Sequence, residues 1–336
     1  MSAESRFGVL DGWRGISILV VLACHLLPIG PKTLHLNVAA GLLGMSLFFT
    51  LSGFLVTHFL LNRSGILDFL IRRLFRILPL AWLYILIVLL LHPVSRDAWL
   101  AHIFFYANYP PKPLIPVTDH IWSLCVEMHF YIGAALLIAL FNKRGLLFIP
   151  AICIGITLWR VYAGMHDSVI THFRIDEILA GSILALIYDR QFGLKIIDRM
   201  SRVNYLFVLP LLLIACHSDG GFMNYFRPYL AALLIGTTLF NQDTRFAKFL
   251  ENRILFYIAS VSFALYVIHP LLVSSWLGSG DIVEKYSKRP LLLLILFICA
   301  HISTYYYEQK AIGVGKKLSS KLHDILARVN SFFSIS

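Results

Sequence analysis

Long apolar runs separated by short polar segments recur along the whole chain. Because a membrane-spanning helix needs about 20 apolar residues, hydropathy and helix breakers divide the sequence into ten candidate spans. The expected spans cover residues 11–29, 37–61, 75–92, 121–141, 146–164, 174–190, 204–217, 225–241, 254–277 and 290–309. Residues 98–110 are too short to cross a bilayer and are expected to lie at its interface or to re-enter. The pattern predicts an all-α, polytopic membrane protein.

Composition supports a chain that sits in a lipid bilayer. Of its 336 residues, 58% are hydrophobic and 14% are charged, whereas soluble domains average about 25% charged residues. We expect one transmembrane domain over residues 1–317, a cytoplasmic tail over 318–336, and no cleavable signal peptide or fused extracytoplasmic domain. The five cysteines have no paired spacing and indicate neither disulfides nor a metal site.

Basic residues are distributed unequally between the two sides that the ten spans define. Of the 29 Lys and Arg residues, 20 fall on the side of the N-terminus, including Arg6, Arg14 and those in segments 63–76, 143–144, 190–202, 245–253 and 310–328. Since cytoplasmic loops of membrane proteins are enriched in Lys and Arg, both termini are predicted to be cytoplasmic. The net charge of +11 is explained in the same way, without nucleic acid as a partner.

The first span, LDGWRGISILVVLACHLL, contains ionisable residues that are costly in hydrocarbon. Asp11 and Arg14 lie at its mouth, and His25 lies eleven residues beyond Arg14. At about 100° per residue the two cations share a helix face, about 16 Å apart along the axis. They are expected to line one cavity, with Arg14 near the cytoplasm and His25 deep. The alternative is a histidine satisfied by a neighbouring helix and an arginine that anchors the span.

Two further clusters carry candidate chemistry. Arg73 and Arg76 are three residues apart, so they are neighbours on one helix face, and guanidinium groups bind phosphate oxygens bidentately. Glu127 lies in the motif HIWSLCVEMHFYI beside Trp122 and Tyr131. Its carboxylate could orient a histidine, accept a hydroxyl proton or bind a sugar hydroxyl. The alternatives are a basic anchor for the pair and a structural ion pair for Glu127.

Weaker candidates occur later in the chain. Arg174 and Asp176 occur in FRIDEILAGSILA, and His269 precedes a proline in SFALYVIHP, where we expect a helix break. No phosphate-binding glycine loop, HExxH motif or GxSxG motif is found.

Taken together, these segments resemble the membrane-bound acyltransferase-3 family, the O-acyltransferases of bacterial surface sugars and some secondary metabolites. The resemblance runs from about residue 7 to 317 and rests on several motifs in the family's order: LDGWRGISILVVLACH, LFFTLSGFLVTHFLL, RRLFRILPLAWLYI, IWSLCVEMHFYI, FRIDEILAGSILA and SFALYVIHP. It implies ten helices in the bacterial inner membrane, cytoplasmic acyl-CoA as donor, and a carbohydrate hydroxyl as acceptor. The family's motifs fall on Arg14 and His25, on Arg73 and Arg76, and on Trp122, Ser123 and Glu127.

The chain departs from the family in two respects. Met128 and His129 stand where many members have a second glutamate and a glutamine, so a role that needs a carboxylate pair is not expected. Many relatives also carry a fused extracytoplasmic domain. This chain is expected to act alone, as a homo-oligomer, or with a separate extracytoplasmic partner.

The resemblance and the residues together give a mechanistic hypothesis. Arginines at the cytoplasmic face would hold the phosphates of acyl-CoA, and His25 would act as general base on the acceptor hydroxyl. A transient acyl-histidine is the rival mechanism. The competing classes of protein are a transporter that uses Arg14, His25 and Glu127 as a proton or substrate pathway, and a catalytically inactive sugar-binding protein.

Overall fold

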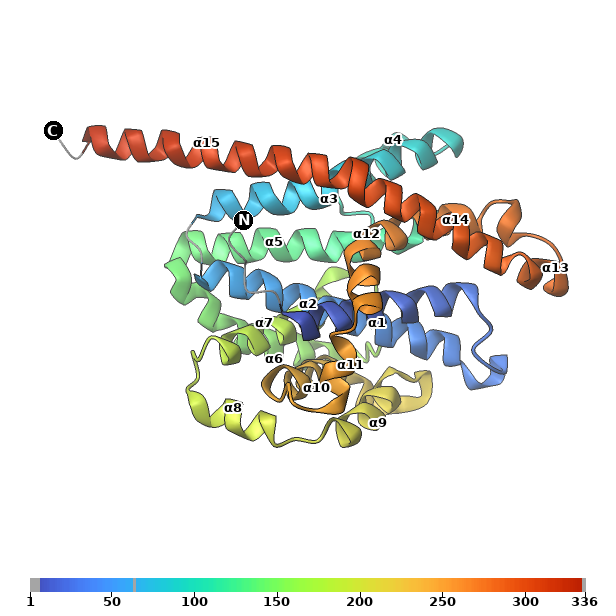
Figure 1. Ribbon diagram of the computed structural model, residues 1–336, viewed down its shortest axis with the longest axis horizontal. Helices are drawn as coiled ribbons and strands as arrows, with labels where there is room; N and C mark the ends of the chain where they lie inside the picture. Colours follow the sequence, from blue (N-terminus) through green and yellow to red (C-terminus); the bar gives the residue numbers. More distant parts are fainter. Residues whose placement is uncertain (1–6, 63–64, 334–336) are drawn as a thin grey trace.

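The computed structural model describes residues 7–62 and 65–333, and these form helices and connecting loops only. Arg6 and Arg63, two cations of the predicted cytoplasmic side, lie outside the described residues. The α-helices are α1 Gly8–Leu26, α2 Leu36–Asn62, α3 Ile66–Leu91, α4 Arg96–Ile103, α5 Trp122–Phe141, α6 Ile149–Tyr162, α7 Asp176–Tyr188, α8 Leu194–Ser201, α9 Tyr205–Cys216, α10 Arg227–Phe240, α11 Arg245–Leu250, α12 Arg253–Val273, α13 Ile282–Ser287, α14 Arg289–Ile302 and α15 Gln309–Phe333 (Figure 1). Short 3₁₀ turns connect several of them, among them η2 (Asp119–Ile121) before α5 and η4 (Thr171–Phe173) before α7.

Each of the ten predicted spans coincides with a helix, but not every helix is long enough to cross a bilayer. Six helical segments of the described chain are sufficiently long and apolar, or seven if α8 and α9, bent by 87°, form one span. Helices α7 and α10 have 13 and 14 residues and rise only about 20 Å, less than the hydrocarbon thickness of about 30 Å. The all-helical architecture is therefore confirmed, and several helices are long and apolar enough to cross a membrane, whereas the number of ten spans is not confirmed.

Loops that the charge pattern assigned to one side lie together at one end of the helix bundle. His58 near the end of α2 hydrogen-bonds to Asp189 after α7 (2.8 Å), and the ammonium group of Lys143 donates to the Leu61 carbonyl (2.7 Å). At the opposite end, the Asn108 side chain donates to the Val169 carbonyl (2.9 Å). We call the first the basic end, after Arg72, Arg73 and Arg76, and the second the histidine end, after His25, His120 and His269.

Close helix contacts fix the centre of the bundle. Helix α2 packs against α7, and α1 packs against both α2 and α12. A β-carbon at Gly53 would lie 1.8 Å from the Ile178 carbonyl oxygen, and one at Gly181 would lie 1.9 Å from that of Thr50. Because only glycine permits such an approach, these two positions set the spacing of α2 and α7. This spacing holds the beginning of α7, with its charged residues, against α2.

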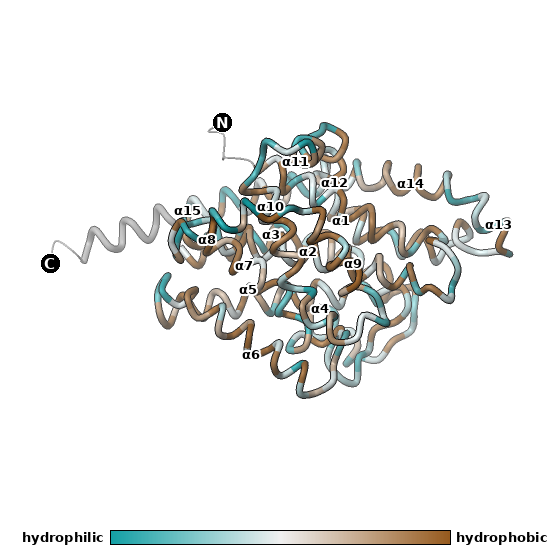
Figure 2. Tube along the Cα trace, turned by 90° about the horizontal axis from the view of Figure 1, so that it is seen from below, coloured by the Kyte–Doolittle hydropathy of each residue, from teal (hydrophilic) through white to brown (hydrophobic). Residues whose placement is uncertain are grey.

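Peripheral helices present hydrophobic side chains outward, as expected for contact with lipid. Large exposed hydrophobic residues occur on α6 (Ile154, Leu158) and on α14 (Leu294, Ile298). Figure 2 shows mainly hydrophobic residues along these two helices, with hydrophilic residues gathered near helix connections. Such a surface would be unstable in water, so it agrees with the membrane location that the sequence predicts.

The last part of the chain is a long helical segment that crosses the bundle and extends beyond it. Helix α14 continues through a π-helical turn, η7 (Ser303–Glu308), into α15, and Figure 1 shows α15 running beside α3 and past the body of the molecule. The Tyr307 hydroxyl donates to the Pro79 carbonyl (3.1 Å). Helix α15 itself also packs along α3 over part of its length.

Candidate functional site

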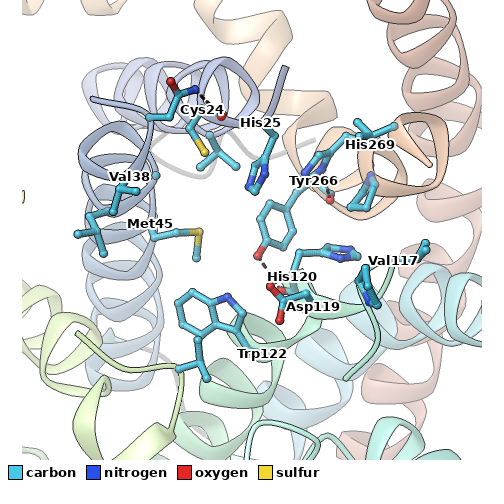
Figure 3. Close-up of a pocket in the computed structure, with 18 of the residues that line it drawn as sticks. Cys24, His25, Val38, Met45, Val117, Asp119, His120, Trp122, Tyr266 and His269 are labelled. Atoms are coloured by element: carbon cyan, nitrogen blue, oxygen red, sulfur yellow. Dashed lines mark hydrogen bonds between the residues drawn. The ribbon is translucent and has the colours of Figure 1, made fainter. Parts of the chain in front are cut away.

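A cavity of about 750 Å³ occupies the histidine end of the bundle. Its wall is built from the end of α1, the beginning of α2, η2 with the start of α5, the loop before α7 and the end of α12. His25 points into this space from α1 (Figure 3). We call it the histidine cavity. Its size and mixed apolar and polar lining suit a small organic ligand.

Three imidazoles from three different elements meet at the wall of the histidine cavity. The ring centroids of His25 on α1 and His269 on α12 lie 5.1 Å apart, and those of His269 and His120 on η2 lie 5.6 Å apart. His25 is exposed, whereas His269 and His120 are buried. The side chain of His25 faces open space in the histidine cavity, at the end of the bundle away from the basic end.

Hydrogen bonds orient the residues around His269. Its Nδ1 lies 2.7 Å from the Tyr266 carbonyl oxygen, which can only accept, so this nitrogen carries the proton and Nε2 is left as an acceptor. The Tyr266 hydroxyl donates to the His120 carbonyl (2.8 Å) and lies 2.6 Å from the Ser123 hydroxyl. Ser123 therefore positions Tyr266. The helix break expected at His269 is not present, because α12 continues through Pro270 to Val273.

Trp122 and Arg174 lie on another part of the histidine cavity wall. The Arg174 guanidinium lies 5.3 Å from the centre of the Trp122 ring. It is buried and forms salt bridges with Asp167 and, at 3.3 Å, with Glu177. The paired cation fixes the indole in place, and the exposed Asp119 adds a carboxylate to the wall.

A second, smaller cavity of about 50 Å³ contains the arginines. Arg14, Arg73 and Arg76 line it together with Glu127 and Tyr131, and we call it the arginine cavity. Arg14 lies 3.4 Å from Asp11. Among the described residues no salt bridge is formed by Arg73 or Arg76, so both guanidinium groups are available to an anionic ligand.

Glu127 is buried in the wall of the arginine cavity. Its carboxylate accepts hydrogen bonds from the Ser52 hydroxyl and from the Tyr131 hydroxyl (3.2 Å). The Arg73 guanidinium lies 5.9 Å from the Tyr131 ring centre. The structural ion pair weighed as the alternative role for Glu127 is not found among the described residues.

Two further spaces adjoin the arginine cavity. At the basic end a recess of about 230 Å³, the mouth cavity, is lined by Phe59, Phe69, Arg72, Arg73, Arg76, Ile312 and Lys316. Between the arginine and histidine cavities lies a space of about 10 Å³, the neck, lined by Arg14, Ser17, Ile18, Val21, Met45, Phe48, Ser262 and Tyr266.

Shared lining residues put the four spaces in sequence. Arg73 and Arg76 line both the mouth cavity and the arginine cavity. Arg14 and Phe48 connect the arginine cavity to the neck, and Tyr266 connects the neck to the histidine cavity. The four spaces therefore follow one another from the basic end to the histidine end, and the smallest of them, the neck, has room for about one water molecule.

The structure separates residues that the sequence brought together. Arg14 and His25 line consecutive spaces on one path, not one cavity, and Glu127 lies with the arginines, away from His25. His120, Asp119 and Tyr266 line the histidine cavity but were not singled out. A usable signal existed for two of them: Tyr266 precedes His269 by three residues on one helix face, and His120 opens the motif that contains Trp122.

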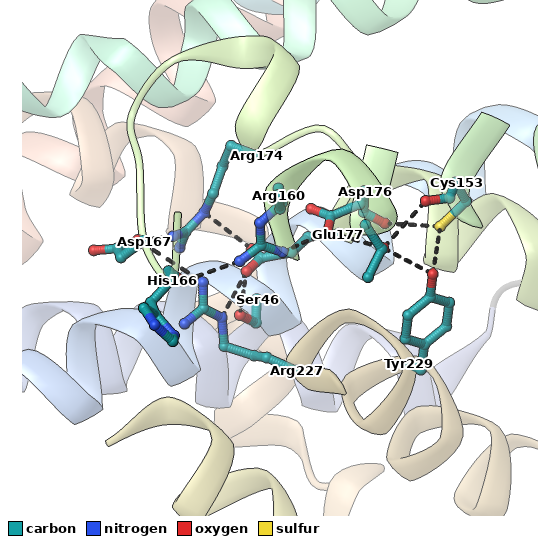
Figure 4. Close-up of polar contacts among 11 residues, drawn as sticks. Ser46, Cys153, Arg160, His166, Asp167, Arg174, Asp176, Glu177, Arg227 and Tyr229 are labelled. Carbon is teal, nitrogen blue, oxygen red and sulfur yellow. Dashed lines mark hydrogen bonds and ion pairs between the residues drawn. The ribbon is translucent and has the colours of Figure 1, made fainter. Parts of the chain in front are cut away.

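Asp176 belongs to a buried ionic network and not to the cavities. Its carboxylate pairs with Arg160 at 2.5 Å, and both side chains are fully buried. Arg227 pairs with Glu177 at 2.8 Å, and Glu177 also accepts a hydrogen bond from Ser46 on α2 (3.0 Å). Figure 4 shows the network, which joins α2, α6, α7 and α10.

The same network holds the loop at the rim of the histidine cavity. Asp167 on this loop pairs with Arg174 and lies 3.8 Å from Arg227. Partial burial alone would raise the pKa of Asp167, but the charges of Arg174 and Arg227 outweigh it and lower the pKa below its usual value. Asp167 therefore stays ionised and ties this loop to two buried cations.

Comparisons with known proteins agree with this arrangement. Residues 7–309 match a family model described as an acyltransferase domain. The chain is 27% identical over 354 residues to the O-acetyltransferase OatA of Staphylococcus aureus (strain NCTC 8325 / PS 47), covering 89% of this chain and 56% of that protein. It is 30% identical over 317 residues to provisionally named O-acetyltransferases of S. aureus strains COL and MSSA476, covering 79% of this chain and 50% of each relative.

These relatives are longer proteins, and the chain spans about half their length. No solved structure matches the chain. The family match covers nearly all of the described helices, including those that carry the arginine cavity, the neck and the histidine cavity. The chain therefore belongs to the acyltransferase-3 family.

Proposed function

We propose that this protein is an integral-membrane O-acyltransferase that moves an acyl group, most simply acetyl, from cytoplasmic acyl-CoA to a hydroxyl of a cell-surface or exported glycan. The observation that carries the proposal is the series of four spaces from the basic end to the histidine end. Anion-binding groups lie at one end of the series, and a histidine with an open cavity lies at the other. The basic end would face the cytoplasm, in agreement with the excess of Lys and Arg there.

The donor fits the basic end by charge. Arg73 and Arg76 have no salt-bridge partner among the described residues, and guanidinium groups bind phosphate oxygens strongly. The pantetheine arm of coenzyme A is long and thin, so it suits a narrow passage. From Arg14 to His25 the path is about 16 Å along α1, and opening of the neck would let the thioester reach the histidine cavity.

The polar groups and the aromatic wall of the histidine cavity suit a carbohydrate acceptor. Trp122 offers a flat apolar surface to a sugar ring. The exposed Asp119 carboxylate can accept hydrogen bonds from sugar hydroxyls. The acceptor would enter from the side opposite the donor, which explains why the large cavity lies at the histidine end.

His25 is proposed as the general base. Its neutral imidazole takes the proton of the acceptor hydroxyl, and the oxygen attacks the thioester carbonyl carbon. The carbon–sulfur bond then breaks, and the departing thiolate receives that proton and leaves as coenzyme A. An acyl-histidine would require two half-reactions, and ping-pong kinetics would identify it.

Purified protein in lipid nanodiscs tests the proposed function directly. With acetyl-CoA and candidate glycans we expect release of free coenzyme A and glycan acetylation. Both should be lost in the Arg73→Ala/Arg76→Ala variant, because the donor phosphates lose their ligands. Transport of a solute across vesicles without acetyl-CoA, in the absence of acetylation, would instead identify a transporter.

A further inference from the structure

Helix α15 forms one wall of the mouth cavity. Ile312 and Lys316, four residues apart on α15, line the recess opposite Phe59 on α2 and Phe69 and Arg72 on α3. Residues i and i+4 lie on the same helix face. The last helix therefore contributes side chains to the space where the donor would enter.

The contact between α15 and α3 is close and specific. A β-carbon at Gly315 would lie 2.6 Å from the β-carbon of Phe75, so a glycine is needed at this point of contact. The Ser319 hydroxyl donates to the Asp68 carboxylate, which also accepts from Arg72 (2.5 Å). Lys316 lies between these two contacts in sequence and is held against the mouth cavity.

Charges in the mouth cavity are unbalanced. Arg72 is paired with Asp68, but no salt bridge to Arg73, Arg76 or Lys316 is found in the described part of the chain. The described residues that line this recess of about 230 Å³ include four cations and no carboxylate, and such a lining attracts anions. The recess therefore suits a ligand with more than one negative charge.

The cations of the mouth cavity are placed to bind different phosphate groups of coenzyme A. Arg73 and Arg76 also line the arginine cavity, so they are placed for the pyrophosphate that leads into the pantetheine arm. Lys316 lines the mouth cavity but not the arginine cavity, so it lies farther from the path of the thioester. The phosphate farther from the thioester in coenzyme A is the one on the ribose 3′ position.

We propose that α15 completes the donor site and that Lys316 binds the ribose 3′-phosphate of acyl-CoA. This inference rests on the proposed function, because it assumes that acyl-CoA is the donor. In this region the sequence predicted only the end of the transmembrane domain and a cytoplasmic tail. The proposal gives α15 a binding role. Lys317, the next residue, is also exposed but does not line the recess, and it serves as the matched control.

Binding of coenzyme A and of 3′-dephospho-coenzyme A to the full chain in phosphatidylcholine nanodiscs, measured by calorimetry, tests the proposal. We expect Lys316→Ala to weaken coenzyme A binding about fivefold, as for one ion pair at a surface. Lys317→Ala should bind within about twofold of the unchanged protein, and Lys316→Arg should retain binding. Removal of the 3′-phosphate should weaken binding to the unchanged protein by a similar factor and cause no further loss in Lys316→Ala.

Three results would be distinguishable. If Lys316→Ala loses affinity for coenzyme A but not for the dephospho form, the inference stands. If the unchanged protein binds coenzyme A and Lys316→Ala binds it equally well, the inference is overturned while the proposed function remains. If the unchanged protein binds neither compound, the proposed function fails, and this inference fails with it.

Discussion

The imidazole rings of His25 and His269 lie 5.1 Å apart, centre to centre, although their helices, α1 and α12, are far apart in the sequence. The Nδ1 proton of His269 is committed to the Tyr266 carbonyl, so its Nε2 is free to accept a hydrogen bond. We expect an N–H group of His25 to donate to this nitrogen, because the two rings are neighbours on the wall of the histidine cavity. His269 would then fix which nitrogen of His25 remains unprotonated and able to act as the base.

Replacement of His269 by alanine should lower kcat about tenfold, the loss expected for one hydrogen bond of about 1.4 kcal/mol. The KM for acyl-CoA should be unchanged, because His269 does not line the arginine or mouth cavities. Steady-state kinetics over both substrates would measure this. Since His269 is buried, thermal unfolding must first show that the variant is folded. A folded variant with normal kcat would exclude this positioning role.

Glu127→Gln should affect the donor and not the acceptor. The carboxylate lies in the arginine cavity, where an amide can still accept from Ser52 and Tyr131 but no longer attracts the nearby arginines. We expect the KM for acyl-CoA to rise by about threefold to tenfold, in line with the loss of one partly buried charge interaction. The acceptor KM should stay within about twofold. An increase in acceptor KM alone would place Glu127 at the acceptor after all.

Phe48→Ala should relax the choice of acyl chain. Phe48 lines the neck and stacks on Tyr266, with ring centroids 6.2 Å apart and planes inclined by 12°. Removing the ring widens the narrowest part of the path, so transfer of butyryl relative to acetyl should rise about tenfold. Phe263 lines the arginine cavity but not the neck, and Phe263→Ala is the control. Equal ratios in the two variants would show that the neck does not select the acyl group.

Asp167→Asn should destabilise the loop at the rim of the histidine cavity. Because the side chain is about half exposed, the expected loss is only about 1 kcal/mol, despite its two buried arginine partners. The pKa of Asp167 is lower in the folded protein than in the unfolded chain. Its contribution is therefore complete at neutral pH and is lost as the pH falls through the unfolded and then the folded pKa.

Thermal unfolding in nanodiscs at several pH values measures the effect of Asp167→Asn. The difference in Tm from the unchanged protein should be present at neutral pH and should shrink below about pH 4. Asp243→Asn, at an exposed carboxylate of the basic end, is the control and should leave Tm unchanged. A Tm difference that does not vary with pH would mean that Asp167 acts through packing and not through its charge.

Much of the helical architecture could be predicted from the sequence, because apolar runs and charged breaks mark helices strongly in a membrane protein. All ten expected ranges coincide with helices. The number of ten spans is not confirmed, because hydropathy does not distinguish a short buried helix such as α7 or α10 from one that crosses the bilayer. Both begin at charged residues that are buried in the ionic network, Asp176 and Arg227.

Local spacing on one helix predicted part of the site, whereas contacts between helices could not be predicted. The helix period placed Arg73 and Arg76 together, and the structure puts both on the arginine cavity. It also suggested one cavity for Arg14 and His25, but side chains of α2 and α12 close the neck between them. The meeting of His25, His120 and His269 depends on the packing of three distant segments.

The most direct test of the account is acylation of the surface glycan in cells that lack this protein and are complemented with variants at equal membrane levels. Nuclear magnetic resonance or mass spectrometry of the isolated glycan would measure ester content. We expect the unchanged chain to restore acylation. His35→Ala, at an exposed histidine that does not line the cavity, should restore it as well. His25→Ala should restore none, and glycan acylation by His25→Ala at the normal level would contradict the central role assigned to His25.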